Sequence, residues 1–190
     1  MESESRSLRA AFSEAEAQRK AIESSLATTG SSFQDNLLAT IKTYEECLRI
    51  TNQVSLFSPN ETLEDINSSD LQYLLINFYL ADLVLKRTGG DRKAILIQAR
   101  DHYERFLQLL DSYDMLSRAD AKLFEKFTES PNTFSIASTT DAAARRGTKI
   151  ARFKEQKELK QKLEVQTTLC EVFTCHSPHS VVSPKESHSP

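Results

Sequence analysis

Glycine and tryptophan are scarce in this sequence. It contains no Trp and only four Gly among its 190 residues, and two of the four are adjacent at Gly89 and Gly90. This leaves little material for tight hairpin turns or for glycine-rich loops that hold phosphate groups. Stretches rich in Ala, Leu, Glu, Lys and Gln favour helix instead. We therefore predict an all-α protein.

Cysteine and long apolar runs are also scarce. The three cysteines, Cys47, Cys170 and Cys175, form an odd set without the spacing of a disulfide framework, so we expect reduced thiols. No stretch approaches the roughly 18 apolar residues that a membrane span needs. The charged segment MESESRSLRAAF at the start does not resemble a signal peptide. These features predict a cytoplasmic protein without a membrane partner.

Apolar residues make up 39% of the sequence, which is enough to fill one hydrophobic core. They recur at helical spacing in six segments, each bounded by residues that cap or break helices. We expect helices from Leu8 to just before Gly30, Ser32 to Ser58, Ser69 or Asp70 to Lys86, Asp91 to Tyr113, Ser117 to just before Pro131, and Thr140 or Asp141 to about Leu163.

The arrangement of these helices follows from their patterning. The third segment, LQYLLINFYLADLVLK, is apolar on nearly every side and should lie at the centre. Successive helices with short connections predict an antiparallel helical stack, a solenoid similar to tetratricopeptide proteins, although no sequence repeat of that length occurs. After Glu164 the composition turns to Ser, Pro and His, which is typical of disorder. We expect a helical domain over residues 1–164 and a disordered tail over residues 165–190.

Catalytic chemistry has little support. Three of the four histidines fall in the last 15 residues, and His102 has no paired nucleophile or carboxylate motif, so we expect it to be structural or at the surface. A metal site built from the cysteines and histidines at positions 170, 175, 176 and 179 matches no common zinc spacing. We predict no enzyme, no cofactor and no metal.

The charge distribution indicates a binding surface. Residues 145–162 carry eight basic and two acidic residues, whereas the whole chain has a net charge of -3. Such a run is most often a solvated helix face. Here Arg146, Lys149, Arg152 and Phe153 lie three or four residues apart and several can share one face. An acidic protein surface and a nucleic-acid backbone are both possible partners, and a plain helical scaffold is the third alternative.

Two segments, LFSPNETLEDINSSDLQYLLINFYLADLVLK and RGTKIARFKEQKELKQKLE, resemble the type-2A phosphatase-associated protein family over about residues 5–164. The resemblance implies an all-helical, tetratricopeptide-like domain. It also implies direct binding to the catalytic subunits of type-2A-class Ser/Thr protein phosphatases, which keeps them stable and latent, and a role in TOR signalling. Nucleic acid is not expected as a partner, and the protein alone should be monomeric.

The same resemblance implies a binding site in the basic segment. The family motif R-x-x-K-I-x-R-[YF]-K falls on residues 146–154, so the expected partner-binding residues are Arg146, Lys149, Arg152 and Lys154. The chemistry is reasonable, because the planar Arg fork pairs with a carboxylate and Lys one turn away adds a second charge. Within the motif, Ile150 and Phe153 are expected to anchor the helix to the preceding helices.

The sequence departs from the family in two places. Gly147 lies between the two leading basic residues and costs roughly 1 kcal/mol relative to Ala inside a helix, which predicts a bend or fraying near Arg146. The segment from Val165 does not resemble the family, whose members continue into a long C-terminal half with a Trp-containing end. We therefore expect a C-terminally truncated member.

Overall fold

The computed structural model describes residues 6–26, 30–58, 60–136 and 140–174, with side chains up to residue 166. Helices are the only regular secondary structure in these ranges, so the all-α prediction is confirmed. The chain divides into two compact units, Met1–Glu129 and Ser130–Pro190, and the helical domain over residues 1–164 stays a prediction. The helices are α1 (Leu8–Ser24), α2 (Ser31–Gln53), α3 (Ile76–Leu85), α4 (Arg92–Ser112), α5 (Arg118–Glu129) and α6 (Ala142–Thr174), with 3₁₀ turns η1 (Leu63–Asp65) and η2 (Leu71–Leu75).

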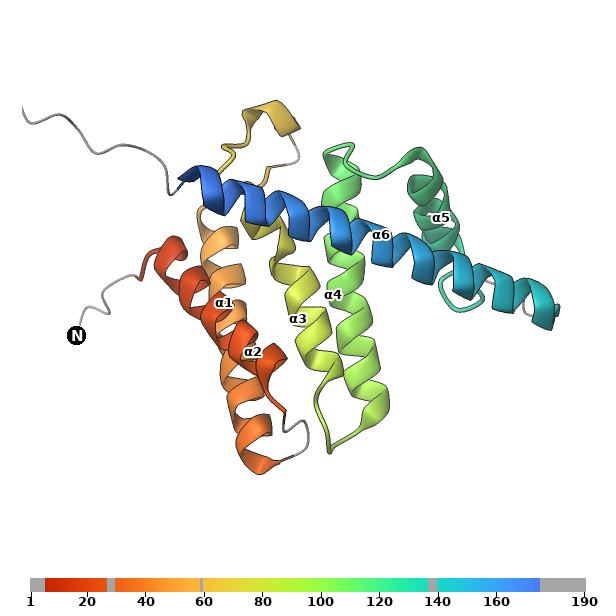
Figure 1. Ribbon diagram of the computed structural model, residues 1–190, viewed down its shortest axis with the longest axis horizontal. Helices are drawn as coiled ribbons and strands as arrows, with labels where there is room; N and C mark the ends of the chain where they lie inside the picture. The colour runs from red at the N-terminus through yellow and green to blue at the C-terminus, as the bar shows by residue number, and fades with distance from the viewer. Residues whose placement is uncertain (1–5, 27–29, 59, 137–139, 175–190) are drawn as a thin grey trace, which may run out of the picture. The chain divides into compact units, whose positions relative to one another are not determined.

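The first unit is a stack of antiparallel helices. Helices α1 and α2 pack side by side, α3 and α4 do the same, and contacts between α2 and α3 join the two pairs (Figure 1). Burial of their facing apolar stripes supplies the main stabilisation of such a stack. The core residues that are fully enclosed include Leu37, Tyr44, Leu80, Leu83 and Val84.

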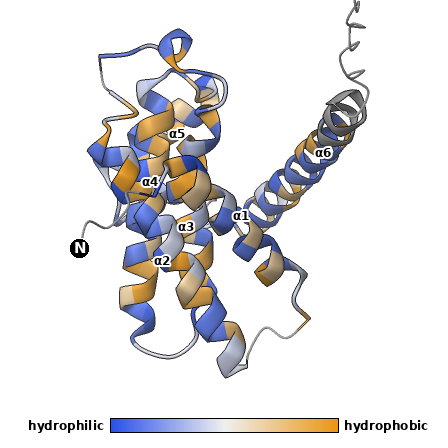
Figure 2. Ribbon diagram, turned by 90° about the vertical axis from the view of Figure 1, so that its left-hand side faces the viewer, coloured by the Kyte–Doolittle hydropathy of each residue, from blue (hydrophilic) through white to orange (hydrophobic). Residues whose placement is uncertain are grey.

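The most apolar segment lies at the centre, as predicted. Six of the ten residues of α3 are buried, and hydrophobic colouring dominates this helix in Figure 2. The segment is not one continuous α-helix, however, because η2 occupies its first five residues. Asp70 precedes η2 and makes no side-chain capping hydrogen bond. Tight 3₁₀ turns are common at such uncapped helix beginnings.

Three of the predicted helix starts are confirmed by capping hydrogen bonds. The Asp91 carboxylate accepts a hydrogen bond from the Lys93 amide at 2.9 Å. The Ser117 hydroxyl accepts from the Asp120 amide at 3.1 Å and donates to the Asp120 carboxylate at 2.7 Å, which resembles a capping box. Asp141 accepts hydrogen bonds from the first turn of α6.

Two predicted boundaries in the first hairpin are wrong. Helix α1 ends at Ser24 rather than near Gly30, and α2 begins at Ser31 with Gly30 rather than Ser32 as its N-cap. The φ of Gly30 is −75° and its ψ 157°, which is the extended conformation of an N-cap. Glycine is acceptable at that position as well as at helix C-termini, so its presence did not distinguish the end of one helix from the start of the next.

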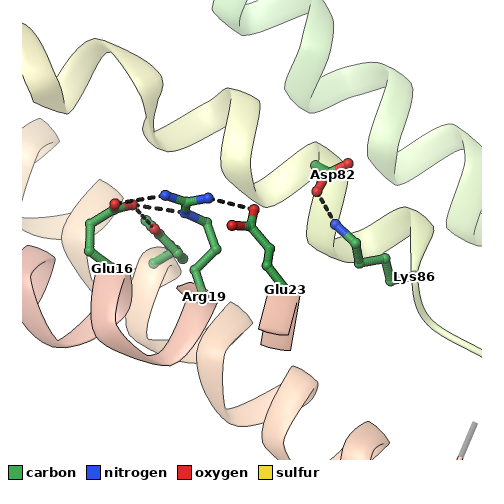
Figure 3. Close-up of polar contacts among 6 residues, drawn as sticks. Glu16, Arg19, Glu23, Asp82 and Lys86 are labelled. Atoms are coloured by element: carbon green, nitrogen blue, oxygen red, sulfur yellow. Dashed lines mark hydrogen bonds and ion pairs between the residues drawn. The ribbon is translucent and has the colours of Figure 1, made fainter. Parts of the chain in front are cut away.

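A polar cluster links α1 and α2. The Nε and Nη2 atoms on one edge of the Arg19 guanidinium donate to the Glu16 carboxylate at 2.9 and 2.8 Å, and Nη1 donates to Glu23 at 2.5 Å (Figure 3). The Tyr44 hydroxyl of α2 donates to Glu16 at 2.5 Å. Burial opposes ionisation of Glu16, but the hydrogen bonds from Arg19 and Tyr44 and the Arg19 charge outweigh it and hold the Glu16 pKa below its usual value.

Buried polar residues complete the core of this unit. The His102 side chain is buried rather than at the surface, and its Nδ1 lies 3.1 Å from the Asn77 side-chain oxygen. Cys47 is a buried free thiol, and burial raises its pKa to about 11. Among the side chains that the structure describes, no cluster of His, Cys, Asp and Glu is arranged to hold a metal. Residues 175, 176 and 179 and the side chain of Cys170 lie outside this part.

Helix α6 is longer than predicted. It runs from Ala142 to Thr174, so the expected end near Leu163 and the expected boundary at residue 164 both fall inside it. No Gly or Pro occurs between residues 163 and 174, and the Val and Thr residues there each lower helix propensity by less than about 1 kcal/mol. Residues 175–190 lie outside the described part.

Hydrophilic residues predominate along α6 in Figure 2. No helix in the described ranges is both long and apolar enough for a bilayer span.

Candidate functional site

The start of the second unit is fixed by two local structures. The Ser130 carbonyl accepts hydrogen bonds from the amides of Thr133, at 3.2 Å, and Phe134, at 2.9 Å, which closes a turn after Pro131. The Asp141 carboxylate then accepts hydrogen bonds from the amides of Ala143 and Ala144, at 2.8 and 3.1 Å, and begins α6. Capping of this kind stabilises a helix by typically about 1 kcal/mol.

Residues 134–136 and the part of α6 from Thr148 to Gln156 enclose an open hollow of about 600 Å³. We call it the loop–helix hollow. Its apolar part comes from Phe134, which is half-buried, and from Ile136 and Phe153, which are exposed. Its polar part comes from the basic motif and its neighbours. The full lining consists of Phe134, Ser135, Ile136, Thr148, Lys149, Arg152, Phe153 and Gln156.

The structure places the four predicted site residues on different sides of α6. Lys149 and Arg152 both line the hollow. Successive residues of an α-helix are about 100° apart around its axis, so Arg146 and Lys149 lie about 60° apart on adjacent turns. Lys154 lies about 140° from Lys149 and about 160° from Arg152, but only about 80° from Arg146. Arg146, Lys149 and Arg152 span about 120° of the helix surface, and Lys154 lies outside that arc, beyond Arg146.

The charges of the site are largely uncompensated. Arg152 forms an ion pair with Glu155, with a nitrogen–oxygen distance of 3.3 Å. Arg146, Lys149 and Lys154 are exposed, and within the described ranges their charged groups form neither a hydrogen bond nor an ion pair. Two cations on adjacent turns are thus available to an anionic partner.

Ile150 and Phe153 were expected to anchor the helix to the preceding helices. Of these two residues, 46% of Ile150 and 67% of Phe153 are exposed, and their contact with the first unit stays a prediction. The α-helix continues through Gly147 without a break, contrary to the fraying expected near Arg146. A Cβ at this position would meet nothing within 4 Å, so packing does not explain why glycine stands there.

Sequence reasoning missed the loop that completes the hollow. Residues 132–140, NTFSIASTT, were read only as a polar connection. The available signal was a pair of large apolar residues, Phe134 and Ile136, in an otherwise polar segment. Spacing along α6 cannot reveal this contact, because the two residues precede the helix.

Comparison with known proteins identifies the family. The sequence profile of the TAP42-like family matches residues 8–171. The chain belongs to the TAP42-like family. This confirms the family resemblance, and the match continues seven residues past Glu164, so the expectation that the segment from Val165 is unlike the family is wrong for its first residues.

Individual relatives share 30% sequence identity or less with this chain and are longer than it. The chain is 30% identical over 139 residues to a rice protein named PP2A regulatory subunit TAP46, which covers 73% of this chain and 31% of the rice protein. It is 26% identical to the yeast type 2A phosphatase-associated protein 42, over 69% of this chain and 41% of that protein. Human immunoglobulin-binding protein 1 family member C is 28% identical, over 79% of this chain and 46% of the human protein. The chain thus spans about a third to a half of the length of these relatives.

A solved structure supports the fold. The chain in the structure titled "The Structure of Tap42 Alpha4 Subunit" superposes with a TM-score of 0.67 at 20% sequence identity, over 92% of this chain and 82% of that one. At this identity the likeness supports the helical architecture alone.

Proposed function

We propose that this protein is a non-catalytic regulator that binds the catalytic subunits of type-2A-class Ser/Thr protein phosphatases through the face of α6 that carries Arg146 and Lys149. The observation that carries the proposal is the pair of exposed, unpaired cations one turn apart. Family membership and the names of the rice and yeast relatives support the choice of partner.

Electrostatics favour a carboxylate-bearing surface as the contact. Arg146 offers a planar fork for a bidentate carboxylate contact, and Lys149 adds a compact charge on the next turn. Outside residues 145–162 the chain has a net charge of -9, so an acidic partner is attracted to this segment and repelled elsewhere. Losing one member of a desolvated interfacial ion pair costs roughly 2–5 kcal/mol, because its partner is left buried and unpaired.

Binding of this kind would stabilise the catalytic subunit. A partner that binds the folded form alone raises its stability in proportion to the logarithm of its concentration over Kd. In the proposed role the protein holds the catalytic subunit in a stable, latent form in the cytoplasm, with the first unit acting as a tetratricopeptide-like scaffold. The link to TOR kinase signalling forms part of the same proposal and predicts that the complex in cells responds to TOR inhibition.

The decisive experiment reverses the two charges. The full chain and the double variant Arg146→Glu/Lys149→Asp are tested for binding to purified catalytic subunit of protein phosphatase 2A by calorimetry. We expect binding by the wild type and loss of at least roughly 100-fold in affinity for the variant. The matched control is Lys160→Glu/Lys162→Asp, which changes the net charge equally on an exposed stretch of the same helix. Unchanged affinity of a folded Arg146→Glu/Lys149→Asp variant would refute the proposed contact.

The proposed stabilisation of the catalytic subunit is tested by a separate thermal measurement. The melting temperature of the catalytic subunit is recorded with increasing amounts of the wild-type chain and of the charge-reversed variant. The wild type should raise it in a concentration-dependent way and the variant should not. Enzymatic activity of the bound catalytic subunit, measured in parallel, distinguishes a latent complex from an active one.

A further inference from the structure

The loop–helix hollow combines an apolar surface and a cationic one. Its apolar side presents Ile136 with 57% and Phe153 with 67% of their surfaces exposed, next to the half-buried Phe134. Its other side presents the side chains of Lys149 and Arg152. Exposed aromatic and aliphatic side chains grouped in a concave surface with a charged rim are typical of the energetic centre of a protein interface.

The partner that fits this surface has a defined chemistry. An apolar side chain in the hollow would displace water from Phe134, Ile136 and Phe153, which is favourable in proportion to the area covered. Lys149 lacks a partner within the described part of the chain, so a carboxylate next to that apolar side chain would be attracted to it. The volume of about 600 Å³ exceeds the needs of one side chain and suits a helix turn or a short extended segment.

We propose that the loop–helix hollow takes a large apolar side chain from an acidic segment of the phosphatase catalytic subunit, whose neighbouring carboxylates pair with Lys149 and Arg146. This inference rests on the proposed function and extends it from a purely electrostatic contact to an apolar contact with a charged rim. It also adds residues 134–136, which precede α6, to the interface.

The structure offers matched variants for testing the apolar contact. Ile136→Ser and Phe153→Ser each remove an apolar side chain from the hollow without changing the charge. Leu159→Ser removes one of equal exposure, 59% against 57% for Ile136, from a part of α6 outside the hollow. Phe and Ser have about the same helix propensity, whereas Leu159→Ser lowers it slightly, so a larger loss of affinity at Phe153 would not come from helix propensity.

Affinity for the purified catalytic subunit of protein phosphatase 2A is measured by calorimetry with each full-length variant at low and high salt. We expect Ile136→Ser and Phe153→Ser to weaken binding roughly tenfold each and Leu159→Ser to change it less than about twofold. The loss caused by Lys149→Glu should shrink at high salt, whereas the losses at Ile136 and Phe153 should persist, because salt screens charges and does not weaken apolar contacts. Circular dichroism confirms that each variant is folded.

The possible failures are distinguishable. If the wild type binds and the charge-reversed variant does not, but Ile136→Ser and Phe153→Ser bind as Leu159→Ser does, the proposed function stands and the apolar contact is refuted. Absence of binding by the wild type would overturn both proposals. If sedimentation shows a dimer of the wild type that Ile136→Ser dissociates, while phosphatase binding is unaffected, the occupant is a second copy of this chain and the proposal is wrong.

Discussion

The guanidinium carbon of Arg19, on α1, lies 4.3 Å from the centroid of the Tyr79 ring, on α3. The same guanidinium contacts Glu16 through two nitrogens, and only 14% of the Arg19 side chain is exposed. Burial opposes the Arg19 charge, but the hydrogen bonds from its nitrogens to Glu16 dominate and raise the Arg19 pKa. One side chain thus connects two helices that are not neighbours in sequence.

Replacing Arg19 by Met should destabilise the protein by roughly 1–3 kcal/mol, because Glu16 would keep its partly buried charge without the cation that balances it. Chemical denaturation monitored by circular dichroism gives the free energy of unfolding. The matched control is Arg49→Met, since Arg49 makes an equivalent two-nitrogen contact with Glu46 on an exposed helix face, at 2.6 and 2.7 Å. That change should have little effect. Equal losses at the two positions would contradict the assigned role of burial.

The stability of the first unit should depend on pH through His102. Burial is the main cause that lowers the His102 pKa from its ordinary value of 6.5, and the Arg105 charge lowers it further, against a smaller opposite effect of Asp101. As the pH falls below about 6.5, the unfolded chain binds a proton that the folded chain does not, so the free energy of unfolding decreases. The decrease should end once the pH is below the folded-state pKa.

Denaturation of the wild type and of His102→Gln between pH 8 and pH 4 tests this dependence. Gln retains a donor for the Asn77 oxygen and does not titrate, so the wild type should lose more stability than the variant as the pH falls through this range. The other three histidines of the sequence are present in both proteins and cancel in the difference. Parallel stability curves would show that another group dominates.

Single charge reversals at Lys149 and Lys154 should separate position from net charge. Both residues are exposed and both changes alter the charge of the chain equally, but Lys149 lines the hollow and Lys154 lies about 140° away around the helix. Lys149→Glu should weaken phosphatase binding at least roughly tenfold and Lys154→Glu less than about threefold. Similar losses measured by calorimetry for the two variants would indicate that the total charge matters more than the face.

Replacing Gly147 by Ala should stabilise α6 by about 0.5–1 kcal/mol. The backbone is helical there and a Cβ meets nothing within 4 Å, so Ala gains helix propensity without a clash. Hydrogen exchange of the α6 amides measures the local effect, and slower exchange near Arg146 is expected. Since a more rigid helix pays less entropy on binding, phosphatase affinity should stay equal or rise. A large loss of affinity would instead show that a partner approaches the helix backbone at this position.

The sequence predicted those features that depend on neighbouring residues. Periodicity located the six α-helices, and the side chains of Asp91, Ser117 and Asp141 identified three of their starts. The end of α6 was harder to predict, because composition changes after Glu164 while no residue there breaks a helix. Gly30 was wrongly predicted to end the first helix, because glycine occurs both before the start and after the end of helices, and here it is the N-cap of α2.

Some of the candidate site residues could be predicted from the sequence and others could not. The spacing of Arg146 and Lys149 on a helix follows from the sequence, because three residues correspond to nearly one turn of any α-helix. The separation of Lys149 from Lys154, about 140° around the helix, follows from the same geometry. The contribution of Phe134 and Ile136 does not, since these residues precede α6 and their position beside Lys149 is set by tertiary structure.

The sequence alone thus determined the helical class and the position of a cationic face, because helix propensity, capping and side-chain period act over a few residues. Its two motifs carried the resemblance to the family. Only the tertiary structure decided that Arg19 is partly buried between Glu16 and Tyr79, and that an apolar hollow lies beside Lys149. Both features join residues that are distant along the chain or separated by a loop. Packing of the chain brings these residues into contact, and the charge or apolar character of a residue does not predict which distant residue it contacts.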